Sequence, residues 1–78
     1  MDPNGDLKSV RRFLRLDQVI DATGYQKSKI WQLVADGKFP TPIPLDDTPR
    51  SAVAWDESEI AAWQQQRLRV RDQRRAAA

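Results

Sequence analysis

Residues 17–37, which read DQVIDATGYQKSKIWQLVADG, decide the fold. Asp17 suits a helix N-cap, because its carboxylate can accept hydrogen bonds from the free N–H groups of a first helical turn. Gly24 readily adopts the left-handed conformation that follows the last turn of a helix. The sequence therefore predicts a first short helix over residues 18–23.

A second helix is predicted over residues 27–36. Ile30, Leu33 and Val34 stand at i, i+3 and i+4, which places them on one helical face. Gly37 supplies the stop, and the prolines that follow it prevent the helix from resuming. Two short helices joined by a few residues around a glycine are typical of a helix-turn-helix.

Beyond residue 42 the apolar period changes from 3.6 to 2. Two alternating runs, residues 43–45 and 53–55, are separated by the turn-rich segment 46–51. The sequence thus predicts a two-stranded β-hairpin, or wing. Its inward-facing side chains are expected to be Ile43, Leu45, Val53 and Trp55.

A C-terminal helix is expected to begin after Asp56, which can cap it, with Glu59 three residues on as in a capping box. Ile60, Trp63 and Val70 share one face, and Arg67 lies on the same stripe. The complete prediction is a mainly α fold with a small β-hairpin, a winged helix-turn-helix over residues 11–72. Residues 1–10 are expected to form a flexible arm, residues 12–16 an edge strand or extended lead-in, and residues 73–78 a disordered basic tail.

Composition excludes several classes of function. The 78 residues suffice for one domain and include no cysteine and no histidine. Zinc, haem and thiol chemistry are therefore not expected, and a Ser-His or Cys-His catalytic pair is ruled out. We expect no enzyme and no cofactor. No apolar run approaches the roughly 20 residues of a membrane span, and no signal peptide is visible, so a cytoplasmic protein without a membrane partner is expected.

Positive charge gathers at the two ends of the chain. The net charge is only +2, but residues 67–78 hold five arginines and one aspartate, and residues 1–16 hold four basic and two acidic residues. Basic ends around a balanced centre are either solvated tails or phosphate contacts. They support DNA binding only if the middle of the chain presents a helix or strand that can contact base edges.

The outer face of the second helix is a candidate for that element. With Ile30 pointing inward, the opposite face carries Ser28, Gln32 and Ala35, flanked by Lys29 and Trp31. A glutamine amide can pair with an adenine edge, and a lysine can donate to guanine acceptors or to a phosphate. Lys27, at the helix start, suits a backbone contact.

A plain solvated face is the alternative explanation for these polar side chains. For Trp31 the alternatives are packing against the hairpin and stacking on a sugar-phosphate edge. Trp55 and Trp63 are expected to be core residues, because a domain this small needs large apolar side chains to hold its layers together.

Two motifs resemble the AlpA family of small phage and prophage regulators. They are Gly37-x-Phe39-Pro40-x-Pro42, after the second helix, and Val53-Ala54-Trp55-x-x-x-Glu59-Ile60-x-x-Trp63. The likeness extends over about residues 11–72. That family is related to phage excisionases and to the MerR-type winged helix domain, so the resemblance implies a DNA-binding transcriptional regulator whose second helix enters the major groove. Matching residue by residue places Lys27, Ser28, Lys29, Trp31 and Gln32 on the recognition helix and Arg50 in the wing.

Other functions stay open at this point. Some relatives act as excisionases, which bend attachment-site DNA for an integrase. A DNA-packaging recognition subunit usually has a long partner-binding extension, which the short tail here does not supply. A protein-interaction module is the alternative outside DNA binding. The expected partners are double-stranded DNA together with an integrase or RNA polymerase, bound by a protein that is monomeric in solution and occupies repeated sites.

Overall fold

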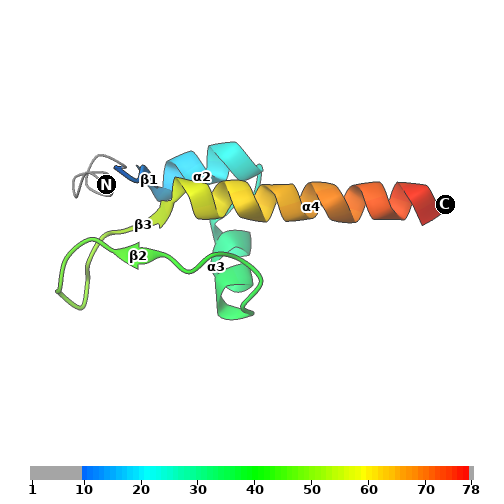
Figure 1. Cartoon of the computed structure of the whole chain (residues 1–78). Helices are drawn as coiled ribbons and strands as arrows, with labels where there is room; N and C mark the ends of the chain where they lie inside the picture. The colour runs from blue at the N-terminus through cyan, green and yellow to red at the C-terminus, as the bar shows by residue number, and fades with distance from the viewer. Residues whose placement is uncertain (1–9, 78) are drawn as a thin grey trace, which may run out of the picture.

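Two short helices and one long helix surround a small antiparallel sheet (Figure 1). The computed structural model describes residues 10–77, so most of the expected N-terminal arm lies outside the described residues. The elements are β1 (Phe13–Leu14), α2 (Leu16–Thr23), α3 (Lys27–Ala35), β2 (Ile43–Pro44), β3 (Val53–Asp56) and α4 (Glu57–Ala77). This order, a helix-turn-helix followed by a hairpin and a C-terminal helix, confirms the winged helix-turn-helix.

The helix α2 begins earlier than predicted. Arg15 is its N-cap, and the Arg15 backbone N–H donates to Oε1 of Gln18 at 2.8 Å. Because Gln18 satisfies that N–H, the helix starts at Leu16, and the prediction of Asp17 as the cap was wrong. Asp17 instead lies in the first turn, where its charge favours the positive end of the helix dipole.

Both predicted glycine stops are confirmed. Gly24 has a φ of 77° and donates its N–H to the carbonyl of Ile20. After α3, Gly37 has a φ of 70°, its N–H bonds to Val34, and the next N–H, that of Lys38, bonds to Leu33. That pair of bonds is the Schellman arrangement, which satisfies the last carbonyls of the helix.

The sheet has three strands in the order β1-β3-β2, so the edge-strand alternative for residues 12–16 is confirmed and adds a strand to the two of the hairpin. The lead-in segment supplies the extra edge strand β1, in which Leu14 pairs with Trp55. In the hairpin, Ile43 lies opposite Ala54, and Pro44 lies opposite Val53.

This register corrects the predicted inward face of the hairpin. Directly paired residues of an antiparallel ladder share a face, so Ile43 and Leu45 lie on the face of Ala54, whereas Trp55 lies on the other. Leu45 is accordingly 42% exposed. The strand β3 is buried on both faces, since Ala54 and Trp55 are each fully inaccessible.

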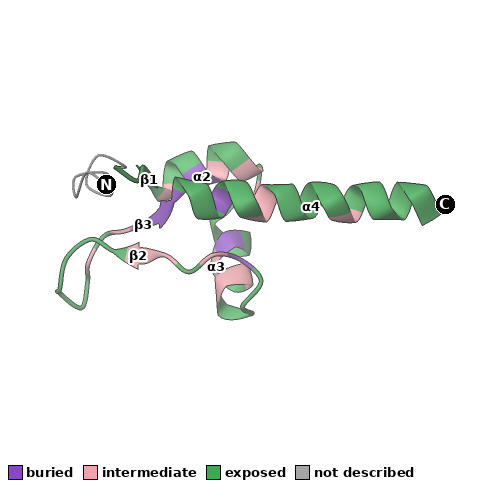
Figure 2. Ribbon diagram, in the orientation of Figure 1, coloured by how far each residue is buried: buried purple, intermediate pink, exposed green. Residues whose placement is uncertain are grey.

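The core lies where β3 meets the first half of α4 and the inner faces of α2 and α3 (Figure 2). Trp55 is its largest fully buried side chain, and Trp63 packs against the cluster as a half-buried residue, so both predicted core tryptophans contribute. The other buried members of the cluster are Leu14, Val19, Ile30, Phe39 and Ile60.

Asp56 caps α4 as predicted, but its partner is not Glu59. Its Oδ1 accepts the Ser58 backbone N–H at 3.0 Å and the Ser58 hydroxyl at 2.9 Å. The carboxylate is buried and forms an ion pair with Arg11, while Arg12 lies 3.5 Å from Glu57. Two of the N-terminal arginines therefore join β1 to the start of α4.

The helix α4 continues further than predicted. Residues 73–78 were expected to be disordered, but the helix extends to Ala77, and its second half projects beyond the rest of the domain (Figure 1). Arginine, glutamine and alanine are good helix formers, which explains the continuation without packing partners. No helix among residues 10–77 combines the length and the apolar character needed to cross a membrane.

Candidate nucleic-acid interface

The outer face of α3 is exposed, as the periodicity indicated. Lys27, Ser28, Lys29 and Gln32 are all exposed, whereas Ile30 on the opposite face is fully buried. Five of the six candidate residues, the four named here and Trp31, therefore belong to one nine-residue helix whose inner face is fixed in the core. A polar surface held this way can present donors and acceptors in a fixed geometry.

The start of α3 favours an anion. Its N-cap, Gln26, makes no side-chain capping hydrogen bond, and no acidic residue lies in the first turn. Lys27 and Lys29 add two positive charges to the partial positive charge of the helix N-terminus. This end of the helix suits a phosphate group.

Trp31 has a structural partner. Its ring lies 5.5 Å from that of Trp55 at an angle of 50°, and the side chain is half-buried. Packing, one of the two alternatives that the sequence left open, therefore accounts for its apolar surface. A contact between its exposed edge and DNA stays a prediction.

Two indole hydrogen bonds hold the segment that follows α3. Nε1 of Trp55 donates to the carbonyl of Pro40 at 2.9 Å, and Nε1 of Trp63 donates to that of Lys38 at 3.1 Å. Phe39, between these two acceptors, is buried and lies 4.9 Å from the Trp63 ring. Sequence reasoning missed Phe39 as a positioning residue, although the Gly-x-Phe-Pro motif contained the signal.

The wing presents Arg50 on an exposed turn, and the loop that carries it reaches away from α3 (Figure 1). Asp46 organises this loop by accepting hydrogen bonds from the backbone N–H of Thr48 at 2.8 Å and from its hydroxyl at 2.6 Å. These bonds lower the pKa of Asp46 below its ordinary value. Asp46, one of two acids in the wing, thus has a structural function. Because the wing loop reaches away from α3, Arg50 lies apart from the candidate residues of that helix.

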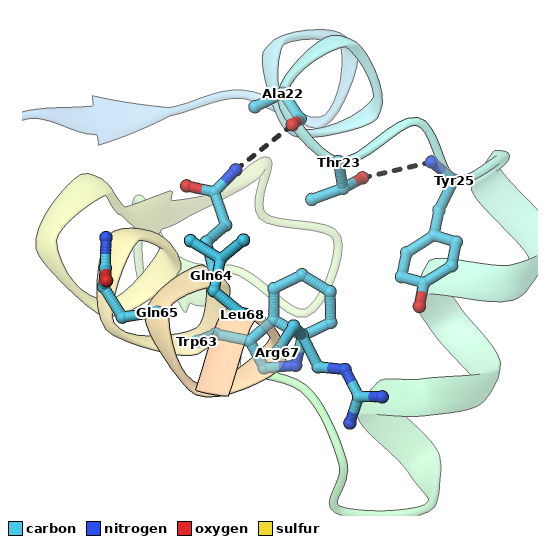
Figure 3. A pocket seen from close by; sticks show the side chains of 8 residues that line it. All are labelled: Ala22, Thr23, Tyr25, Trp63, Gln64, Gln65, Arg67 and Leu68. Carbon is cyan, nitrogen blue, oxygen red and sulfur yellow. Dashed lines mark hydrogen bonds between the residues drawn. The ribbon is translucent and has the colours of Figure 1, made fainter. Parts of the chain in front are cut away.

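A hollow of about 540 Å³ lies beside the start of α3, between the end of α2 and the middle of α4 (Figure 3). Gln64 bridges these helices by donating to the carbonyl of Ala22 at 3.1 Å, and Tyr25 packs edge-on against Trp63. The lining of this hollow includes Arg67 but no acidic side chain, so the hollow offers no pair of groups for acid–base catalysis. Within residues 10–77 there is also no acidic cluster that could hold a metal ion.

A helix-turn-helix with an exposed basic face, followed by a hairpin wing, defines a small protein of the winged helix class. A family model described as prophage CP4-57 regulatory protein (AlpA) matches residues 12–68, and the chain belongs to this AlpA family. The resemblance seen in the sequence is thereby confirmed.

The chain is also similar to a protein of Enterobacteria phage P4 described as uncharacterized protein ORF88. The two are 37% identical over 57 residues, which are 73% of this chain and 61% of the phage protein. The chain therefore spans less than two thirds of that relative's length. No solved structure gives a significant match.

Proposed function

We propose that the protein is a sequence-specific double-stranded DNA-binding protein that regulates transcription and has no enzymatic activity. The observation that carries this proposal is the exposed row of Ser28, Lys29 and Gln32 on a helix anchored through Ile30. Membership of a family of prophage regulatory proteins supports the regulatory role.

In this proposal α3 enters the major groove. The Gln32 amide pairs with an adenine edge, and Lys29 donates to a guanine or to a phosphate. Ser28 is small enough to let the helix approach the base edges closely. Lys27 and the helix N-terminus hold the backbone and so set the register of the helix on the duplex.

Arg50 and Trp31 contribute contacts outside the base edges. Arg50, on the wing turn, contacts a phosphate of the flanking backbone. Trp31 packs on Trp55 and offers its exposed edge to the sugar-phosphate backbone. These two residues add affinity rather than sequence information.

The regulatory description of the family favours transcription over the excisionase alternative. RNA polymerase is then the protein partner, whereas an excisionase would act with an integrase. We propose a monomer in solution that occupies repeated sites on DNA. A gel-shift assay in which the bound site lies at different positions along a DNA fragment distinguishes the two roles. An excisionase bends its DNA strongly, so the mobility of its complex should depend on the position of the site.

The decisive experiment is selection of bound sequences from random duplex DNA. A sequence-specific regulator yields a consensus, and the repetition of that consensus reveals how many copies of the protein bind. Binding that is absent, or that is indifferent to sequence, contradicts the proposal and favours a protein-interaction module.

A further inference from the structure

The second half of α4 carries a row of arginines on one helical face. Arg67, Arg71 and Arg74 follow at intervals of four and three residues, which keeps them on one side of the helix, and Arg75 borders the row. We call Arg67, Arg71, Arg74 and Arg75 the arginine row.

This row extends the packed face of the same helix. Ile60 and Trp63 pack against the core from the first half of α4, and Arg67 is the next residue along that stripe. The apolar face therefore becomes basic at the point where the helix leaves the domain. Figure 1 shows this half of α4 free of neighbouring elements.

The side chains of the row gather around Val70. They form a hollow of about 320 Å³ together with it, and Val70 is half-buried although no other element covers it. The methylene stems of the arginines thus shield the valine while their guanidinium groups stay exposed. The result is a continuous positive surface rather than separate charges.

Such a row is unfavourable for the isolated helix. Arg67 and Arg71 are like charges at i and i+4, as are Arg71 and Arg75, and pairs of this kind destabilise a helix. Within α4's second half, Asp72 is the one acid, and it pairs with Arg71 at 2.9 Å. A bound polyanion would remove the repulsion.

We propose that the arginine row binds the phosphate backbone of duplex DNA beside the site that α3 reads, an inference that rests on the proposed function. Arg67 lines the same hollow as Tyr25, which stands two residues before the start of α3, so the row begins beside the N-terminal end of that helix. From Arg67 to Arg75, at a rise of 1.5 Å per residue, the row spans roughly 12 Å. Along the duplex axis one strand has a phosphate about every 3.4 Å, so this length covers about three phosphate steps.

The spacing of the four arginines along one face depends on the helical conformation of α4. A disordered tail would attract DNA through its net charge, and each of its arginines would then contribute equally to the affinity. A helical row makes contacts from one face alone. A second copy of the chain is a poor occupant, because two such rows would repel each other.

The matched test is Arg71→Ala against Arg69→Ala. Both changes remove one exposed arginine, and each breaks one neighbouring side-chain contact, to Asp72 or to Gln66. The two positions lie on roughly opposite faces, because two residues advance the helix by about 200°. Alanine preserves the helix, which circular dichroism would verify.

Binding to a mixed-sequence duplex is measured over a range of salt concentrations. We expect Arg71→Ala to make the slope of log affinity against log salt shallower by about 0.9, while Arg69→Ala keeps the slope of the parent. Slopes that become shallower by the same amount in the two variants would overturn the proposal in favour of general charge attraction. A parent-like slope for Arg71→Ala would also overturn it, because Arg71 would then make no phosphate contact.

Failure here differs from failure of the proposed function. If the parent binds a selected sequence through α3 and the row makes no contribution, only this inference is wrong. If the parent binds no duplex DNA at any salt concentration, both proposals are wrong.

Discussion

The indole N–H of Trp55 donates a 2.9 Å hydrogen bond to the carbonyl of Pro40, which joins the middle strand of the sheet to the segment that follows α3. The same indole ring packs against Trp31 of α3. One buried side chain therefore positions the candidate recognition helix from two directions.

Replacing Trp55 with alanine should destabilise the domain severely. The change leaves a large cavity at a fully buried site, which costs about 3–5 kcal/mol, most of the stability of a small domain. Trp55→Phe retains much of the volume but leaves the Pro40 carbonyl without its donor, so we expect a smaller loss of about 1–3 kcal/mol. Chemical denaturation measures both values. If Trp55→Ala unfolds at the denaturant concentration of the parent, the assignment of the core is wrong.

Asp56 should contribute to stability through its cap. Asp56→Ala removes the acceptor of the Ser58 N–H and leaves Arg11 without its buried partner, and losing such a cap costs about 0.5–2 kcal/mol. Asp56→Asn keeps a capping oxygen but loses the charge, so we expect an intermediate melting temperature. Asp47→Ala, an exposed change in the wing, is the control and should melt with the parent. A parent-like Asp56→Ala would contradict the capping function.

The wing loop should respond to acid through Asp46. Its hydrogen bonds to Thr48 lower the pKa of the carboxyl below 3.8. The contribution of this carboxylate to the stability of the wing loop is therefore present above pH 3.8. It is lost as the pH falls through the lower pKa of the folded state. Thr48→Ala removes the hydroxyl donor, so the pKa of Asp46 should rise toward 3.8. Carbon NMR of the carboxyl resonance measures the titration, and an unchanged pKa in the variant would show that the hydroxyl is not responsible.

Local chemistry predicted the glycine stops of α2 and α3 and the cap of α4. The Schellman arrangement at Gly37 and the cap at Asp56 each depend on a few neighbouring residues, which the sequence shows directly. The start of α2 was harder, because Asp17 and Gln18 compete as capping groups, and only the backbone path shows that Gln18 satisfies Arg15.

The register of the sheet and the packing of Trp31 could not be predicted from local sequence, because both depend on tertiary contacts. Alternation indicated that each hairpin run has two faces, but it could not indicate that Ile43 pairs with Ala54. Nor could it indicate that β1 pairs with the other edge of β3, a contact that joins Leu14 to Trp55 from distant parts of the sequence. In the candidate site, the exposure of Gln32 followed from helical period alone, whereas the partner of Trp31 lies 24 residues away in sequence.

Arg50 should contribute to affinity without contributing to specificity. In the proposed function Arg50, on the exposed wing turn, contacts a phosphate and no base edge. Arg50→Ala should weaken binding to the selected site and to random DNA by the same factor, with a salt slope shallower by about 0.9. The exposed position predicts an unchanged melting temperature. A change in the selected consensus would show that the wing reads bases.

Gln32 is the residue that we propose reads the base sequence. It is exposed at the centre of the outer face of α3, and Ile30 on the inner face prevents the helix from turning away. Gln32→Ala should lose about 1–3 kcal/mol of binding free energy at the selected site and far less on random DNA, because only the base contact is removed. Gln73, on α4, is another exposed glutamine, so Gln73→Ala is the matched control and should bind the site like the parent.

Both glutamine variants should keep the melting temperature of the parent, so a loss of binding would not reflect unfolding. The selection repeated with Gln32→Ala should relax the consensus at one or two base pairs and leave the rest intact. If the folded variant binds its site as tightly as the parent, α3 does not read the sequence. A protein-interaction module would then be the better description, and the polar face of α3 would be the first surface on which to search for its partner.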